Sequence, residues 1–135
     1  MLLNEILNEM SSSDQSKLKT EIIKLFLPLQ IKVLFTPHFD ERSLDNTVDL
    51  KGIERGSSIL HDEVLDLLTK IRNTYESEFK SGQYMKGILR DNTTYINIPF
   101  TFLFQDKRNT LVLRSIMKKQ KYINTDPNDI LLEIN

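Results

Sequence analysis

TYINIPFTFLF, residues 94–104, alternates between two sets of side chains, and this alternation decides the fold. The even positions are all large and apolar: Ile96, Ile98, Phe100, Phe102 and Phe104. A period of two places them on one face of a β-strand, so this face is predicted to pack on a core. Pro99 cannot donate to a strand ladder. We therefore expect the strand to lie at a sheet edge or to meet a bulge.

Strand patterns flank this segment on both sides. Tyr84–Asp91 precedes it across a polar turn, and Thr110–Met117 follows it across the turn at 106–109. A short tail strand is predicted after the turn at 126–128, where Pro127 stands between Asp and Asn. Connections this short favour antiparallel neighbours, so we predict a mainly antiparallel sheet of three to five strands.

The chain before the sheet is mostly helical in pattern. Residues 58–80 carry a continuous apolar stripe at helical spacing, made of Leu60, Val64, Leu68, Ile71, Tyr75 and Phe79. Ser57 or Ser58 is expected to cap this helix and Gly82 to end it. Two shorter helices are predicted at 2–10 and 15–27.

Between these helices the pattern is less regular. Pro28 ends the helix at 15–27, and Ile31–Phe35 is predicted to be a strand. Residues 36–56 look like a loop with one candidate strand near Thr47–Leu50. The fold class is therefore α+β: two N-terminal helices and one long central amphipathic helix packed on the sheet, in a single domain spanning 1–135.

Composition limits the classes of function. The 135 residues carry a net charge of −1 and no cysteine, which excludes disulfides and thiolate chemistry. No apolar run approaches the roughly 20 residues of a membrane helix, and the N-terminus lacks the pattern of a secretory signal. We expect a soluble protein of the cytoplasm or of a virion.

The two histidines are the candidates for acid–base or metal chemistry. His38 lies near Asp40, and His61 stands next to Asp62, so a four-ligand metal site is conceivable on ligand type. The spacing matches no recurring metal pattern, and neighbouring helix positions diverge. Ser58, three residues before His61, lacks the G-x-S-x-G turn that presents a catalytic serine. We expect no cofactor, and a hydrolase or metal-dependent enzyme is the third interpretation.

The charge distribution supports an alternative function. Residues 86–121 hold eight basic side chains and two acidic ones. A basic surface of this kind can follow a phosphate backbone without any sequence motif. The residues proposed for nucleic-acid binding are Lys107, Arg108, Arg114, Lys118, Lys119 and Lys121.

The leading hypothesis is a non-enzymatic protein-interaction subunit that binds a protein partner or forms a homo-oligomer. It would be a component of a larger phage or bacterial assembly, or a small inhibitor of the immunity-protein type. An edge strand can accept a strand from a partner, and a short amphipathic helix needs a surface to pack on. The residues proposed for this role are Tyr95, Asn97, Pro99 and Thr101 on the strand, and Leu3, Leu7 and Met10 on the first helix.

Overall fold

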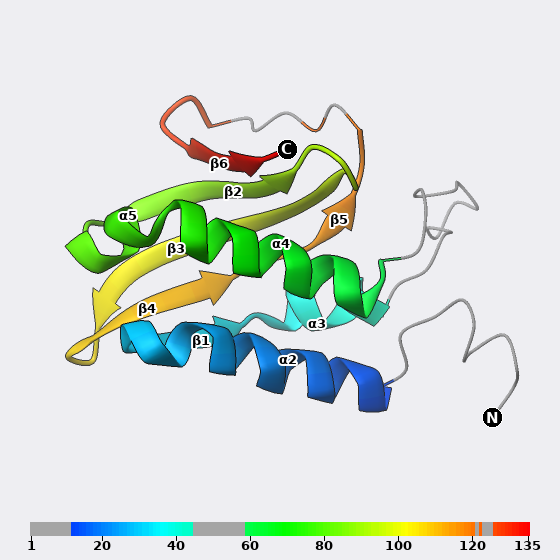
Figure 1. Ribbon diagram of the computed structural model, residues 1–135, viewed down its shortest axis with the longest axis horizontal. Helices are drawn as coiled ribbons and strands as arrows, with labels where there is room; N and C mark the ends of the chain where they lie inside the picture. The colour runs from blue at the N-terminus through cyan, green and yellow to red at the C-terminus, as the bar shows by residue number, and fades with distance from the viewer. Residues whose placement is uncertain (1–11, 45–58, 121, 123–125) are drawn as a thin grey trace, which may run out of the picture.

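The computed structural model describes residues 12–44, 59–120, 122 and 126–135, and it confirms the α+β class (Figure 1). In chain order the elements are α2 (Ser12–Phe26), the 3-10 helix η1 (Leu27–Leu29), β1 (Ile31–Phe35), α3 (Pro37–Leu44), α4 (His61–Thr74), α5 (Glu76–Ser81), β2 (Met85–Asp91), β3 (Ile96–Gln105), β4 (Arg108–Leu113), β5 (Met117–Lys118) and β6 (Ile130–Ile134). The helix predicted at 2–10, the candidate strand at 47–50 and the capping serines fall outside the described residues.

Among the described residues, no helix combines the length and the apolar character that a bilayer span requires.

The sheet has six strands and is mixed. Its order is β1-β4-β3-β2-β6, with β5 beside β3. The pairs of β3 with β2 and β4 are antiparallel, whereas the outer pairs β1–β4 and β2–β6 are parallel. The prediction of a mainly antiparallel sheet of three to five strands is therefore wrong in the number of strands; three of the five strand pairs are antiparallel, but the two outer pairs are parallel. Alternation shows which residues face a core, but it does not show which distant strand lies alongside.

The strand at 94–104 is central, so the prediction that it lies at an edge is wrong. Its proline is accommodated by a bulge instead. Phe100 pairs with Leu113 and Asn97 with Met117, so residues 114–116 face only Ile98 and Pro99. The Pro99 carbonyl accepts a hydrogen bond from the Arg114 N–H at 2.8 Å. Proline has no N–H to donate on this side of β3. The loss has little effect because the bulge at 114–116 already interrupts the regular ladder here.

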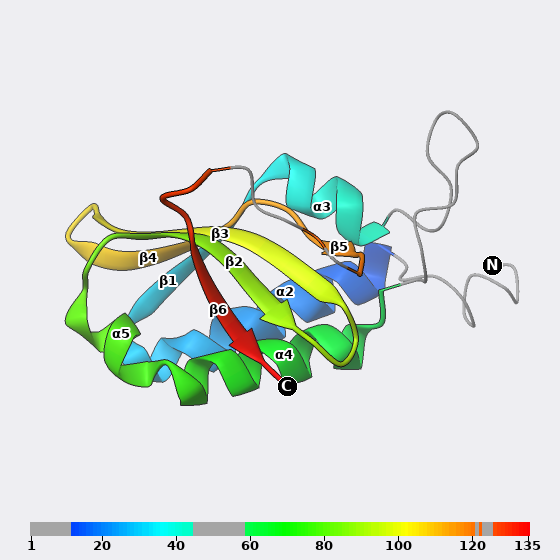
Figure 2. The same cartoon turned by 90° about the horizontal axis from the view of Figure 1, so that it is seen from above.

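Two layers enclose the main core. Figure 2 shows α2, α4 and α5 on one face of the sheet and α3 on the other. The four residues Ile96, Ile98, Phe100 and Phe102 are fully buried against the helices, as predicted. Phe102 meets Phe79 edge-on at 5.3 Å between ring centroids. Phe104 shares this face, but its exposed fraction is 67%.

The helix predicted at 58–80 is two helices. Tyr75, with φ −112° and ψ 26°, separates α4 from α5. Four of the predicted stripe residues are buried: Val64, Leu68, Ile71 and Phe79. Leu60 precedes the first turn of α4 and is 52% exposed, so its assignment to the packed stripe is wrong.

Part of the predicted loop at 36–56 is helix α3. The Thr36 hydroxyl accepts the Phe39 N–H at 3.1 Å, and Pro37 occupies the first helical position. Phe39 is fully buried and contacts the ring of Phe35 at 5.2 Å between centroids. A threonine cap followed by proline was the sequence signal for this helix.

Candidate functional sites

The predicted partner-binding face of β3 is used mainly inside the molecule. Asn97 is 1% exposed, and its side-chain amide donates to the carbonyls of Tyr95 at 3.1 Å and Lys119 at 3.0 Å. Pro99 is buried, and Thr101 is half-buried. Tyr95 is 44% exposed and has a φ of 65°. The hydrogen bond from Asn97 to Lys119 helps to hold the chain at β5 against β3. Leu3, Leu7 and Met10 lie outside the described residues.

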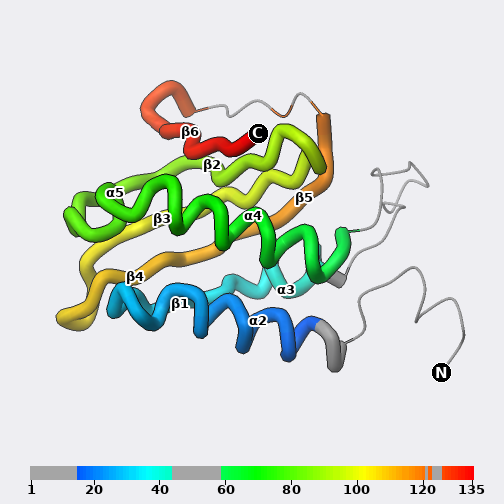
Figure 3. Tube along the Cα trace, viewed as in Figure 1, coloured from blue at the N-terminus to red at the C-terminus, as the bar shows by residue number. Residues whose placement is uncertain are grey.

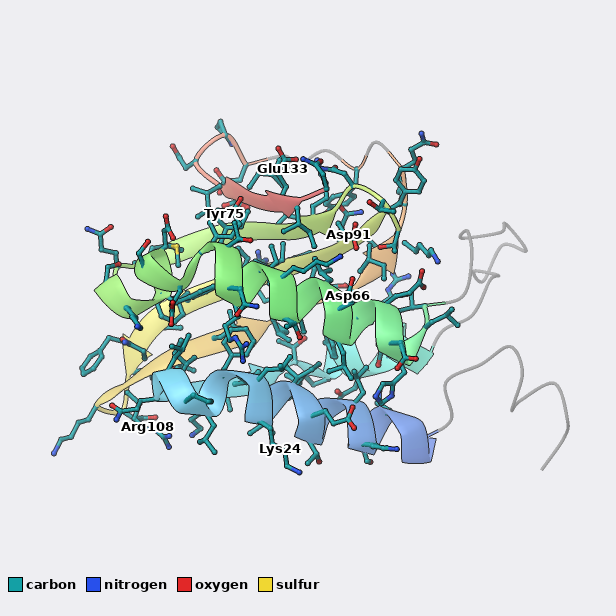
Figure 4. The ribbon with its side chains drawn as sticks, viewed as in Figure 1. Lys24, Asp66, Tyr75, Asp91, Arg108 and Glu133 are labelled. Atoms are coloured by element: carbon teal, nitrogen blue, oxygen red, sulfur yellow. The ribbon has the colours of Figure 1, made fainter. Side chains whose placement is uncertain are left out.

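The sheet edge at β6 carries a tyrosine contact at Glu133. The Tyr75 hydroxyl donates to the Glu133 carbonyl at 2.9 Å and accepts the Glu133 N–H at 3.0 Å. Figure 4 shows Tyr75 and Glu133 close together beside β6. One hydroxyl thus occupies both backbone groups of Glu133, one of the five residues of β6.

The opposite edge, at β1, is open among the described residues. The Thr36 N–H donates to Leu113 of β4 at 3.2 Å. Because N–H groups alternate along a strand, those of Val33 and Phe35 point away from β4. In the described part of the chain, β1 pairs with β4 alone. None of the other described strands uses the outer N–H and C=O groups of β1.

One flank of α2 lies beside this edge. Gln15, Lys19 and Ile23 follow each other at four-residue spacing along one side of α2, and Leu27 follows in η1. Gln15 donates to the Asp40 carbonyl at 2.6 Å, and Lys19 contacts the Asp40 carboxylate at 3.1 Å and lies 5.0 Å from the centre of the Phe35 ring, so the first half of this flank faces α3 and β1. Ile23 and Leu27 are 42% and 57% exposed. We call the outer edge of β1 together with Ile23 and Leu27 the open side; Figure 1 shows α2 lying along β1.

The other flank of α2 packs on α4 through a histidine–carboxylate pair. His61 Nε2 lies 2.6 Å from Glu21 Oε2, and Arg72 donates to the Leu25 carbonyl at 2.9 Å. The hydrogen bond with His61 lowers the pKa of Glu21. The positive charges of His61, Lys17 and Lys24 act in the same direction, and partial desolvation opposes them. The pair joins two helices.

The other predicted histidine belongs to a separate group. His38 is more than half exposed, and its Nδ1 lies 3.9 Å from a Glu41 carboxylate oxygen. The carboxylate of Asp40 contacts Lys19. In the described ranges, no three His, Asp or Glu side chains are placed so that they would hold a metal ion together. The predicted set of four ligands is not assembled there.

The predicted basic residues do not form one patch. Lys118 Nζ contacts Glu63 Oε1 at 3.0 Å, at the start of α4. Arg114 lies over the sheet, where its guanidinium donates to the Phe100 carbonyl at 3.2 Å. Lys107 and Arg108 lie at the opposite end of β4, in its turn from β3. Lys119 is exposed beyond β5, and Lys121 lies outside the described residues.

Two further bases are engaged by the segment that leads to β6. Lys86 Nζ lies 3.7 Å from Asp126 Oδ2 and 4.0 Å from Asp129 Oδ1. Arg90 donates to Asn97 Oδ1 at 2.7 Å and to the Tyr122 carbonyl. These bases hold the crossing segment on the sheet.

A pocket of about 500 Å³ lies where the β3–β4 turn meets the end of α2. Figure 3 shows these parts of the chain close together, and Figure 4 labels Arg108 there. We call it the turn pocket; it is lined by Leu29, Gln30, Lys80, Phe104, Lys107, Arg108 and Asn109. The sequence indicated Lys107 and Arg108 as candidates. It gave no signal that Lys80 and Gln30 would join them, because these contacts depend on the tertiary fold.

No protein-family model matches the chain, and comparisons with curated proteins and with solved structures found no match.

Proposed function

We propose that this protein is a non-enzymatic protein-interaction subunit whose partner adds an extended strand to β1. The observation that supports this most is the open side, where a strand edge that no described strand pairs with lies near two exposed apolar side chains. Strand addition gains affinity from main-chain hydrogen bonds and specificity from alternate side chains. A subunit of an assembly and a small inhibitor both use surfaces of this kind.

The chemistry of the open side defines the partner's strand. The N–H groups of Val33 and Phe35 would pair with its carbonyls. Side chains on its helix-facing side would cover Ile23 and Leu27, and burying one such residue fully contributes about 1.5–3 kcal/mol. Lys32 is exposed on the other face of β1. We therefore propose a strand with apolar residues facing α2 and an acidic residue facing Lys32.

Val33→Pro tests the strand edge. The Val33 N–H points outward, so proline removes a donor that the described fold does not use. The full chain would be purified gently, and its native mass measured by size exclusion with light scattering. We expect the wild-type chain to run as a complex, with a second copy or with a co-purified protein. Val33→Pro should reduce it to the monomer mass while the circular dichroism spectrum keeps its shape; because Val33 is 6% exposed, the free energy of unfolding should also fall.

Ile23→Asp with Leu27→Asp tests the helix flank by the same measurement. The matched control, Thr74→Asp with Ser77→Asp, adds two carboxylates at exposed positions near the α4–α5 junction. We expect the complex to be lost in the first double variant and kept in the control. A wild-type monomer at every concentration, or a complex that survives both open-side variants, would contradict the proposal.

A further inference from the structure

The lining of the turn pocket is strongly basic. Three of its seven residues, Lys80, Lys107 and Arg108, are cationic, and none is acidic. Lys80 contacts Glu76 at 3.2 Å, but both side chains are more than half exposed, so this ion pair is weak and easily exchanged. Gln30 and Asn109 add side-chain amides. This set of donors suits an anion, and arginine in particular can bind phosphate oxygens in pairs.

The rim of the pocket is held by backbone conformations that few residues adopt. Asp106 and Lys107 have φ values of 52° and 64°, as in the tight turns that join antiparallel strands. Gln30, with φ 60°, closes η1 by donating its N–H to the Leu27 carbonyl at 2.9 Å. At Gly82, an added Cβ would lie 3.3 Å from Asn109 Oδ1. Gln30 and Lys107 are therefore carried on tight turns, whereas Arg108 and Asn109 begin β4 and Lys80 belongs to α5.

The pocket also contains an aromatic ring. Phe104 is 67% exposed, although it belongs to the apolar set of β3 whose other members are fully buried. Leu29 lies in the same lining. An exposed ring beside cations offers a stacking surface next to a phosphate site, and bases stack on such rings whatever their sequence.

We infer that the turn pocket binds a nucleotide, with the phosphate on Lys80, Lys107 and Arg108 and the base against Phe104. The volume of about 500 Å³ lies within the range of small-molecule pockets, roughly 300–1,000 Å³. Two sources share this chemistry: a free mononucleotide and the terminal phosphorylated nucleotide of a nucleic-acid strand. The inference does not depend on the open side, which lies along β1 and the flank of α2.

The test is a binding titration of the full chain at low salt, using three probes. These are adenosine monophosphate, a single-stranded oligonucleotide with a 5′-phosphate, and the same oligonucleotide with a 5′-hydroxyl. Inorganic phosphate is titrated as a competitor. Binding of the mononucleotide identifies a free nucleotide as the ligand. Binding of the 5′-phosphorylated strand alone identifies a strand end, and either result supports the inference.

Variants assign the binding to the pocket. Arg108→Ala should lower the affinity for either ligand at least tenfold and make that affinity less dependent on salt concentration. Phe104→Ala should lower the affinity for the nucleotide roughly tenfold. The affinity for inorganic phosphate, measured by competition, should stay unchanged. Both side chains are exposed, so the fold should persist, and circular dichroism checks this. Lys24→Ala, an exposed lysine of α2 outside the pocket lining, is the control and should bind as wild type.

Two outcomes would overturn the inference. One is the absence of binding of all three probes. The other is binding that Arg108→Ala and Phe104→Ala leave unchanged. A 5′-hydroxyl strand that binds as tightly as the phosphorylated strand would also remove the role given to the terminal phosphate.

Discussion

Gly87 shows how a single position in β2 allows the outer strand to pack. A Cβ added there would lie 1.9 Å from the carbonyl oxygen of Ile130, in the first residue of β6. Backbone atoms cannot rotate away as a side chain can, so β6 would have to move. The parallel pairing of β2 with β6 therefore depends on a missing side chain.

Gly87→Ala should lower the free energy of unfolding by about 1–3 kcal/mol, the usual cost of overpacking. Amide exchange in β6 should accelerate more than exchange in β3. Urea unfolding and hydrogen exchange measure the two effects. Thr101→Ala, on the neighbouring strand with its side chain on the other face, is the control and should leave β6 exchange unchanged. Equal protection of β6 in wild type and Gly87→Ala would contradict this interpretation.

The Glu21–His61 pair predicts a dependence of stability on pH. The pKa of Glu21 is lowered below its ordinary value of 4.5 in the fold, chiefly by the hydrogen bond with His61. Its contribution to stability is therefore present above pH 4.5 and is lost as the pH falls through the lowered pKa. Glu21→Gln should be less stable than wild type near neutral pH, and the difference should shrink in acid.

Unfolding curves from neutral to acid pH measure this difference. Glu78→Gln changes an exposed carboxylate outside the pair and should follow the wild-type pH profile. If the difference in unfolding free energy between Glu21→Gln and wild type stayed constant across the pH range, the charge of Glu21 would not stabilise the contact between α2 and α4.

At the scale of elements, Tyr75 joins the helical layer to the sheet edge. It separates α4 from α5, and its hydroxyl contacts both backbone groups of Glu133. Tyr75→Phe should cost about 1 kcal/mol of unfolding free energy, the typical net value of a hydrogen bond. Exchange of the Glu133 amide should accelerate. Tyr84→Phe, at a tyrosine that is 66% exposed, should change neither quantity. Unaltered exchange at Glu133 would mean that another group protects this edge.

Sequence patterns predicted individual elements better than their joints. The alternation of β3 and the spacing in α4 reflect burial, which acts residue by residue, so these elements were predicted. The break at Tyr75 was not predicted, because the apolar stripe continues across it to Phe79 and because the contact of Tyr75 with β6 joins residues distant in sequence. The prediction lacks helix α3 although Thr36 and Pro37 carry its start signal, because residues 36–56 are mostly polar and show no apolar stripe.

At the scale of the whole molecule, neither the strand order nor the sites followed from sequence. β1 lies beside β4 and β2 beside β6, and no local pattern selects such partners. The predicted edge strand, β3, is therefore central, and β1 lies at an edge instead. The predicted basic residues also lie apart, because the fold separates them: Lys118 contacts Glu63, whereas Arg108 lies at the far end of β4.

Removing residues 126–135 tests how much the outer strand stabilises the whole sheet. Leu132 and Ile134 are 7% and 8% exposed, so their loss should cost about 3 kcal/mol or more. It also opens the edge of β2, and an open edge favours association. Urea unfolding and light scattering measure both effects. Removing Asn135 alone should be nearly neutral, and a shortened chain as stable as wild type would contradict the role given to β6.

The parallel pairing of β1 with β4 has a consequence for synthesis. Roughly 70 residues separate the two strands, and the ribosome adds about 5–20 residues per second. For roughly 4–15 s the nascent chain therefore contains β1 before β4, its neighbour in the sheet, has been made. During that interval both sides of the strand are accessible to a chaperone or to another nascent chain. A partner that recognises β1 could thus engage the polypeptide before its own sheet has formed.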